Sequence, residues 1–408
     1  MNIVIMNSVP LNGGDEALLR ATIFLLEKTY SNTKITVLCN DLTNTKKYFP
    51  DLLIAGDLDH VFGKPFKRWS IDHFKILTRS IFFDRFDLSK LLDIPYILLT
   101  SEEKETRNIF IQADLIIASA GGYLHDFYDN NKRLEVFYLL NKIKKQVILF
   151  GQSIGPFWKS NTRTSFLNVL NAVNLILLRE SISLQHLKNL GVSNPATFVT
   201  TDNAFILHEQ YPQLFRYRQQ PKNKIVLSFR YWKDDGAKII QLAKSICILL
   251  LKSPMNSITF LSTCQGVANY TDDSLIAKKI ISQLPTSLQK RCNIDRKKYS
   301  IPDLIEQYSQ YDAYIGMRLH GAILAMLGGT PAFNIGYEDK TKGIYTFMDL
   351  QDQNIFYTED ERKIKKKINF FMENLSDINN DFLATKVKNA AAVAEKNIFY
   401  LKQYYDQA

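Results

Sequence analysis

Short apolar runs recur along this chain, and each is followed by a loop of small or polar residues and then by a helix-like segment. The first half predicts strands at 2–6, 114–118, 146–150 and 175–178, and the second half predicts them at 224–229, 257–261, 312–316 and 331–335. Runs that are apolar throughout are typical of a parallel sheet covered by helices on both faces. The loops after these strands are candidate sites by position, because such sheets bind ligands at the carboxyl ends of their strands.

A polar break at 207–223, which contains Pro212 and Pro221, separates the two series of strands. A chain of 408 residues is also long enough for two domains. We therefore predict an α/β protein with Rossmann-like domains at 1–208 and 222–380 that face a central cleft. Beyond them, apolar residues at steps of three and four predict an amphipathic helix over 381–408 that packs back on the domains.

Residues 64–86 carry a different pattern, an apolar stripe surrounded mainly by Lys and Arg. The stripe is formed by Ile71, Phe74, Leu77 and Ile81. A basic amphipathic segment of this kind can lie on an anionic membrane. A surface helix that packs its stripe on the sheet would show the same pattern, so both interpretations stay open.

Composition narrows the class of protein. Hydrophobic residues make up 46% of the chain and charged residues 23%, as in ordinary globular proteins. The formal net charge of +10 suggests an anionic partner, such as a phosphorylated substrate, an acidic membrane or a nucleic acid, or only a solvated surface bias. The basic residues are dispersed and no nucleic-acid recognition motif is present, so we expect no nucleic-acid partner.

The cysteines and the apolar runs indicate a location. The cysteines, Cys39, Cys247, Cys264 and Cys292, are scattered, as expected of thiols in a reducing compartment. The chain starts directly as a strand, without the pattern of a signal peptide, and its longest apolar runs are too short to span a bilayer. We expect a cytoplasmic protein, with peripheral contact to the inner membrane face left open.

The most informative segment is Arg318-Leu319-His320, which follows a predicted strand and begins a predicted helix. An arginine at a strand end offers a fixed fork of donors for a phosphate or carboxylate, and the helix start also favours an anion. A histidine two residues later is placed to move a proton. Alternatively, Arg318 pairs with a structural carboxylate and His320 caps the helix.

Other strand ends carry candidate ligand contacts. Asn12, Gly13 and Asp15 lie at the first strand-to-helix turn, where glycines let the backbone approach an anion, although Asp15 could simply cap the helix. A second close-approach turn is predicted over 121–126. It contains Gly121, Gly122 and His125. After the strand at 146–150, Gln152 and Ser153 offer an amide and a hydroxyl that suit a hydroxyl-rich ligand.

Arg179 follows another apolar strand, and Lys340 follows the last strand of the second half. With Arg318 they would place three fixed positive charges around one cleft, an expensive arrangement unless a multiply charged anion fills it. For Arg179, an ion pair with Glu180 or a neighbour is an equal alternative. The histidines show no metal-ligand spacing, so we expect no zinc site.

The ordered set of these segments resembles the polysaccharide pyruvyl transferase family over roughly residues 3–345. The segments that carry the resemblance are N-x-G-D-E at 12–16, Gly121-Gly122, 151–156, 179–181, 201–205, the strand ending in Arg230, 317–321, and Tyr337-Glu338-x-Lys340. Residues 262–266 with 272–274 resemble the colanic-acid-biosynthesis-type branch of that family.

The resemblance implies a GT-B-like fold and transfer of pyruvate from phosphoenolpyruvate to two sugar hydroxyls of a cell-surface or exopolysaccharide precursor. The first domain would take the acceptor and the second the donor, and the unmatched insertion at about 57–110 would tune acceptor preference. The resemblance implies His320 and Arg318 as catalytic residues. The expected donor-binding residues are Arg179, Arg230, Arg318, Leu319, His320 and Lys340. The expected acceptor or cleft-lining residues are Asn12, Gly13, Asp15, Gly121, Gly122, His125, Gln152, Ser153 and Glu338.

The chemistry that the resemblance implies needs neither a metal nor another cofactor, and its acceptor is expected to be a lipid-linked oligosaccharide. Two other functions compete with it. A GT-B glycosyltransferase would use a nucleotide sugar, but no acidic ribose clamp is recognisable in the second half, although Glu338 could serve. A non-catalytic protein that binds a glycan or lipid surface could also use this fold, but the intact candidate residues argue against it.

Overall fold

The structure is a computed structural model that describes residues 1–58, 61, 94–217, 221–267, 270–376, 378 and 380–405. The predicted basic segment 64–86 and much of the predicted insertion 57–110 lie outside these residues. The chain forms two compact units. Unit 1 comprises Met1–Pro10, Thr22–Thr200 and Lys396–Ala408, and unit 2 comprises Leu11–Ala21 and Thr201–Glu395.

Unit 1 is built on a parallel sheet with the strand order β3-β2-β1-β4-β6-β7-β8, and β5 pairs with β6 beside that path. Its strands are β1 (Asn2–Met6), β2 (Lys34–Cys39), β3 (Leu53–Gly56), β4 (Leu115–Ala118), β5 (Gly121–Leu124), β6 (Val147–Ile154), β7 (Leu175–Leu178) and β8 (Thr197–Val199). Strands β4, β6 and β7 are buried along their whole length, as expected of strands with helices on both faces.

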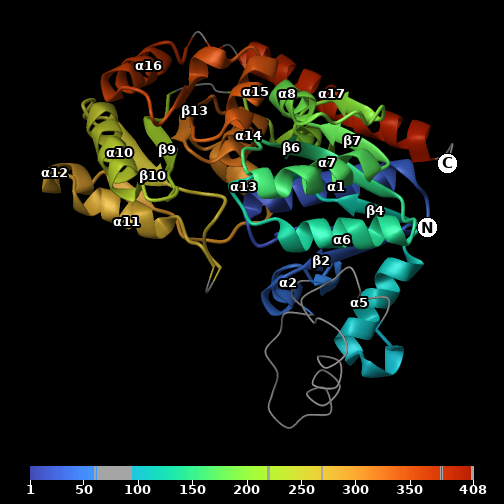
Figure 1. Cartoon of the computed structure of the whole chain (residues 1–408). Coiled ribbons are helices and arrows are strands. Elements are labelled where there is room, and N and C mark those ends of the chain that lie inside the picture. The colour runs from blue at the N-terminus through green and yellow to red at the C-terminus, as the bar shows by residue number, and fades with distance from the viewer. Residues whose placement is uncertain are drawn as a thin grey trace. The chain divides into compact units, whose positions relative to one another are not determined.

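Helices connect these strands, as Figure 1 shows. Those within unit 1 are α2 (Leu42–Tyr48), η2 (Tyr96–Leu98), α5 (Ser101–Gln112), α6 (Asn131–Lys142), α7 (Ser160–Ala172) and α8 (Ser181–Leu190). Two further helices, α1 (Gly13–Thr29) and α17 (Asn380–Tyr405), contribute residues to both units.

Unit 2 is built on a second parallel sheet with the strand order β11-β10-β9-β12-β13-β14. Counted from β9, this is the order 3-2-1-4-5-6 of a Rossmann fold. Its strands are β9 (Lys224–Ser228), β10 (Ser257–Phe260), β11 (Cys292–Ile294), β12 (Ala313–Gly316), β13 (Ala332–Gly336) and β14 (Asn354–Phe356). Its helices are η3 (Asn203–Ile206), α9 (Leu207–Gln210), η4 (Pro212–Leu214), α10 (Gly236–Leu250), α11 (Ser274–Ser282), α12 (Thr286–Gln289), α13 (Ile301–Tyr308), α14 (Leu319–Leu327), α15 (Asp339–Phe347), η5 (Gln351–Gln353) and α16 (Glu361–Glu373).

The predicted parallel α/β architecture is confirmed, but two predicted loops are strands. Strand β6 continues through 151–154, and Gly121 and Gly122 begin β5 instead of a turn. Small and polar residues are rare in strand interiors, so their sequence favoured loops. The backbone stays extended because Gln152 pairs with both β5 and β7 across register shifts.

The C-terminal helix is confirmed as α17, and the predicted apolar stripe is its buried face. Leu383, Val387, Ala391, Ala394 and Leu401 are all buried. The division into units differs from the predicted ranges 1–208 and 222–380. The units change at Thr200/Thr201, and Leu11–Ala21 belongs to unit 2 although both neighbouring segments belong to unit 1.

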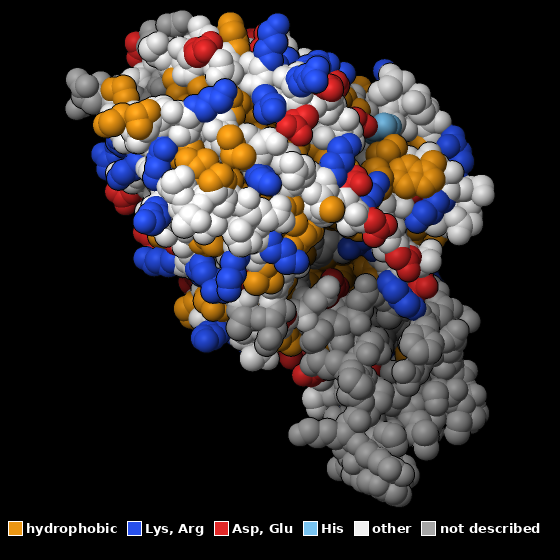
Figure 2. Space-filling model, turned by 90° about the vertical axis from the view of Figure 1, so that its left-hand side faces the viewer, with side chains coloured by type: hydrophobic (Ala, Val, Ile, Leu, Met, Phe, Trp, Pro, Cys, Tyr) orange, Lys and Arg blue, Asp and Glu red, His pale blue; other side chains and the backbone are white. Residues whose placement is uncertain are grey.

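Basic side chains do not gather into one block on the surface drawn in Figure 2. Lys and Arg are spread over that face, with acidic and hydrophobic side chains among them. Among the described residues, no helix is long and apolar enough to cross a membrane.

The turn after α14 gives a test of the fold of unit 2. Gly329 has φ +83°, and a Cβ there would lie 2.2 Å from the carbonyl oxygen of Arg216. We expect Gly329→Ala to lower the free energy of unfolding by about 2–4 kcal/mol, because left-handed strain and overpacking add. Urea titration would measure the loss. Gly191→Ala is the control: φ is +93°, but the nearest atom is 4.0 Å away, so the loss should be about 1 kcal/mol. Equal losses would contradict the steric argument.

Candidate active site

The Arg318-Leu319-His320 segment lies where the sequence predicts it, between a strand end and a helix start. Strand β12 ends at Gly316, Arg318 is the N-cap residue of α14, and His320 lies in the first helical turn. The hydroxyl of Tyr314 donates to the carbonyl oxygen of Arg318 at 2.9 Å. This bond fixes the backbone at the point where the strand turns into the helix.

Arg318 is buried and pairs with a carboxylate. Its Nε and Nη2 donate to the two oxygens of Asp273, each at 2.7 Å, and Asp273 also accepts a hydrogen bond from the Ser262 hydroxyl. Burial alone would lower the pKa of the Arg318 guanidinium, but the charge and hydrogen bonds of Asp273 raise it well above its ordinary value. The guanidinium therefore stays charged and fixed in plane, while Asp273 balances its charge.

His320 also faces a carboxylate. Its Nε2 lies 3.4 Å from Oδ2 of Asp202, whose side chain is completely buried and whose Oδ1 accepts from the backbone N–H of Ala204. On another side of the imidazole lies Gly14, where a Cβ would approach Nδ1 to 2.7 Å. The ring is thus held between a buried acid and a glycine backbone.

The N-terminal glycine loop belongs to the same unit as His320. Asn12 caps α1, since its Oδ1 accepts from the Gly14 N–H at 3.1 Å while its Nδ2 donates to Asp15 at 2.8 Å. The N–H of Gly13 donates to the carbonyl oxygen of Thr263 at 2.7 Å. Asn12 therefore caps α1 and holds Asp15 beside it, and this loop belongs to the second Rossmann-like unit, which was expected to take the donor.

Arg230, which follows β9, has a different environment from Arg318. Its Nη1 donates to the Tyr337 hydroxyl at 2.9 Å, and its guanidinium lies 5.3 Å from the Trp232 ring and 5.2 Å from the Tyr337 ring. Within the described part of the chain, it makes no ion pair. Lys340, in contrast, pairs with Glu338 at 2.6 Å. The argument that Arg318 and Lys340 are uncompensated charges is therefore wrong.

Cys264 lies beside the Arg318–Asp273 pair, because its backbone carbonyl accepts a hydrogen bond from the Asp273 N–H at 2.9 Å. Burial raises the pKa of the Cys264 thiol to about 11, and the charges of Arg318, Asp273, Arg230 and Asp15 also act on it. A thiol with this pKa stays protonated at neutral pH, so Cys264 is not a reactive thiolate. In the described residues, no group of three or more His, Cys, Asp or Glu side chains could hold a metal ion.

Three of the predicted residues of unit 1, Gln152, Ser153 and Arg179, lie at the carboxyl end of β6 or directly after β7. The Arg179 side chain is 1% exposed, and its Nε donates to the Ser153 hydroxyl at 2.7 Å. Gln152 donates through Nε2 to the Ala118 carbonyl at 3.2 Å. Glu180 serves as the N-cap of α8. The convergence of Arg179 with the cations of unit 2 stays a prediction.

His125 has a structural place in this unit. Its Nε2 lies 3.1 Å from the Gly122 carbonyl oxygen, its Nδ1 accepts from the Phe127 N–H at 3.1 Å, and the residue is 3% exposed. Both ring nitrogens therefore hold the loop after β5. Sequence alone does not separate such a histidine from a ligand contact.

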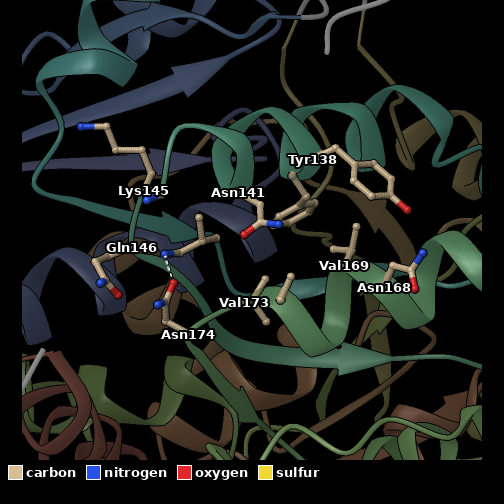
Figure 3. A pocket seen from close by; sticks show the side chains of 12 residues that line it. Tyr138, Asn141, Lys145, Gln146, Asn168, Val169, Val173 and Asn174 are labelled. Atoms are coloured by element: carbon tan, nitrogen blue, oxygen red, sulfur yellow. Dashed lines mark hydrogen bonds between the residues drawn. The ribbon is translucent and has the colours of Figure 1, made fainter.

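A surface pocket of about 300 Å³ also lies in unit 1, between α6 and α7 (Figure 3). Tyr138 and Asn141 line it from α6, and Asn168 and Val169 line it from α7. It reaches Val147, the first residue of β6, whereas Gln152 and Ser153 lie near the other end of that strand. The pocket is therefore separate from the predicted site residues.

Two Rossmann-like units, one of them with an R-x-H element at a strand end, define a protein of the GT-B-like α/β class. The profile of the polysaccharide pyruvyl transferase family matches residues 12–339. The chain therefore belongs to that family. It is also 25% identical over 282 residues, covering 65% of this chain and 67% of the relative, to the amylovoran biosynthesis protein AmsJ of Erwinia amylovora.

Solved structures confirm the fold class. The MnaA–UDP structure from S. aureus has a TM-score of 0.62 at 9% identity, covering 100% of this chain and 97% of the other. The UDP-GlcNAc 2-epimerase of Neisseria meningitidis, bound to UDP-GlcNAc, has a TM-score of 0.59 at 11% identity and full coverage of both chains. Anabaena Alr3699/HepE in complex with UDP has a TM-score of 0.54 at 13% identity, covering 100% and 99%. At these identities the likeness concerns the fold alone.

The Arg318–Asp273 pair yields a stability prediction. Asp273→Asn would leave a buried guanidinium without its counter-charge, so we expect a loss of about 3 kcal/mol or more in the free energy of unfolding. Asp272→Asn is the neighbouring control, because its partner Arg296 is 68% exposed at 3.7 Å, and we expect less than about 1 kcal/mol. Denaturant titration of both variants would measure the difference. Similar small losses would show that Asp273 does not balance Arg318.

Proposed function

We propose that this protein transfers pyruvate from phosphoenolpyruvate to two hydroxyls of a sugar in a cell-surface or exopolysaccharide precursor. The products are a cyclic pyruvate ketal and phosphate. Family membership carries this proposal. It is also supported by the position of Arg230, Arg318 and His320, which follow the neighbouring strands β9 and β12 of the unit 2 sheet.

The donor is a phosphate and a carboxylate on one small molecule, so it needs cations and directed N–H groups. Arg230 supplies the cation, because it carries its charge without a carboxylate partner in the described residues and its guanidinium is held against aromatic rings. Arg318 supplies N–H groups of fixed orientation, because its bidentate pair with Asp273 fixes the guanidinium plane. Lys340 and, from unit 1, Arg179 would complete the donor contacts.

His320 is the proposed general acid. It delivers a proton to the methylene carbon of phosphoenolpyruvate, which becomes a methyl group and leaves an oxocarbenium-like C2. One sugar hydroxyl forms a C–O bond to C2. The phosphate then departs with the electrons of its C–O bond, and the second hydroxyl closes the ketal. The hydroxyls lose two protons in total, one of which restores His320 while the other leaves with phosphate. Asp202 acts as a positioning residue for the imidazole.

The scheme balances without a redox step and requires no metal or other cofactor. A lipid-linked oligosaccharide is the proposed acceptor, since polysaccharide precursors are assembled on such carriers. Its sugar, hydroxyl pair and ketal configuration would be decided by residues outside the donor cluster.

Donor binding is the first test. Calorimetry should show phosphoenolpyruvate binding to the protein and at least tenfold weaker binding to Arg230→Gln, because a charged hydrogen bond is lost. Arg296→Gln, which removes an exposed arginine of the same unit, is the control and should bind normally. Binding of UDP-glucose or UDP-N-acetylglucosamine, with none of phosphoenolpyruvate, would instead favour a nucleotide-sugar glycosyltransferase.

Proton delivery is the second test. With a panel of p-nitrophenyl hexosides as acceptors, we expect His320→Gln to lower phosphoenolpyruvate-dependent phosphate release by about 100-fold or more. Asp202→Asn should lower kcat by about tenfold and change the KM for phosphoenolpyruvate less than about twofold, because it acts through the imidazole. His186→Gln, in α8, should behave like the unchanged protein. Near-normal release by His320→Gln would remove it as the acid.

A further inference from the structure

The pocket between α6 and α7 is a part of unit 1 to which the proposed reaction gives no role. It has a volume of about 300 Å³, and its lining comes from α6, α7 and the chain at the start of β6 (Figure 3). Small-molecule sites have volumes of about 300–1,000 Å³, so the pocket has room for one small ligand or one unit of a larger molecule. None of the described residues that line it belongs to the predicted site.

The buried residues that line the pocket form its floor, and they are apolar. They are Phe137, Val147, Val169 and Val173, which all belong to the core of unit 1. Because Val147 begins a strand that is buried along its whole length, the sheet holds this floor in place. An apolar floor of this kind can contact the C–H groups of a ligand, such as those on one face of a sugar ring.

The rim of the pocket carries side-chain amides. Asn141 on α6 and Asn168 on α7 are exposed, and within the described residues neither side chain has a hydrogen-bond partner. The Oδ1 of Asn174 accepts from the Val147 N–H at 2.9 Å, a bond dashed in Figure 3, so the Asn174 Nδ2 is the atom left for a ligand. Tyr138, which is 37% exposed, adds an aromatic ring and a hydroxyl. Together these groups offer both donors and acceptors.

Amides, and not charges, dominate the polar lining. None of the described lining residues is acidic, and the basic ones are Lys144 and Lys145. The Lys145 ammonium donates to the carbonyl oxygens of Ile111 and Ala113 at 2.6 and 2.8 Å, and Lys144 is exposed, so water solvates its charge. A phosphate or carboxylate only accepts hydrogen bonds, whereas a sugar hydroxyl both donates and accepts, as amides do. The pocket therefore fits neutral hydroxyls better than an anion.

The position of the pocket separates it from the predicted acceptor contacts. Val147 begins β6, and Gln152 lies five residues further along the same strand. At about 3.3 Å per residue, the two residues are about 16 Å apart. A sugar in the pocket is therefore not the sugar that receives pyruvate. A glycan that reached both places would gain apparent affinity, because its second contact becomes intramolecular.

We propose that the pocket between α6 and α7 is an accessory site that binds one neutral sugar unit of the glycan acceptor through Asn141, Asn168 and Asn174. This inference rests on the proposed function, because the acceptor supplies the sugar. It adds to that function a second contact with the glycan, away from the predicted acceptor residues.

The test uses the whole protein and the methyl glycosides of glucose, mannose, galactose, N-acetylglucosamine and glucuronic acid. Asn141→Ala and Asn168→Ala each remove one amide from the rim, and Ala172→Phe, at an exposed lining residue, fills part of the pocket. Asn161→Ala is the matched control, because Asn161 is an exposed asparagine of the same helix, α7, and does not line the pocket. Binding would be measured by saturation-transfer NMR titration, with thermal unfolding to confirm that each variant is folded.

We expect at least one neutral glycoside to bind the unchanged protein and Asn161→Ala equally. The same glycoside should bind Asn141→Ala and Asn168→Ala about fivefold weaker, because each variant loses a hydrogen bond, and Ala172→Phe weaker still. Equal binding to all variants, or no binding of any neutral glycoside up to about 100 mM, would overturn the accessory site. Tighter binding of the glucuronide than of every neutral glycoside would overturn its assignment to a neutral sugar.

Phosphoenolpyruvate calorimetry on the unchanged protein separates this inference from the proposed function. Normal donor binding without the sugar effect removes the accessory site alone. Sugar binding that depends on Asn168, without donor binding, removes the proposed function alone.

Discussion

The buried pair of Arg318 with Asp273 is the interaction on which the geometry of unit 2 depends. Asp273 precedes α11, Arg318 precedes α14, and the Ser262 hydroxyl bonds to Asp273 while it accepts from Ser228 at 3.1 Å. This chain of bonds joins the carboxyl ends of β9, β10 and β12, the three central neighbours of the sheet. A buried ion pair gains little net stability over apolar packing, but losing one partner is costly. The pair therefore contributes mainly to geometry, because it fixes the orientation of the Arg318 guanidinium two residues before His320.

Local features of this site could be predicted from the sequence, and the pairing of its charges could not. A strand followed by R-x-H and an apolar helix can be recognised from the sequence, because all residues of this motif are consecutive. Asp273 lies 45 residues before Arg318, and nothing in its own neighbourhood marks it as the counter-charge. The same holds for Asp202 beside His320. Predictions from cation positions alone therefore overestimated the uncompensated charge.

Glycine-containing segments caused the errors in unit 1. Residues 151–154 and Gly121-Gly122 have the composition of loops, yet they are extended because each pairs with strands distant in sequence. From the sequence His125 is a candidate ligand contact, and in the structure both of its ring nitrogens lie within hydrogen-bond distance of backbone groups of its own loop. Local sequence propensity cannot predict such strand pairing, because the pairing depends on strands that are distant in the sequence. Family resemblance, in contrast, depended on the order of many weak segments, and the family match confirmed it.

Because Leu11–Ala21 belongs to unit 2, this unit cannot complete its folding early in synthesis. These residues leave the ribosome early, but the strands and helices of their unit begin only after Thr200. The contact between Gly14 and His320 thus closes a loop of about three hundred residues, a non-local step that lowers folding rates. During synthesis His320 cannot acquire its complete environment until most of the chain has emerged. A C-terminal fragment made alone would lack the glycine loop beside His320. Unit 2 would then be complete only if it bound residues 1–21 as a separate peptide.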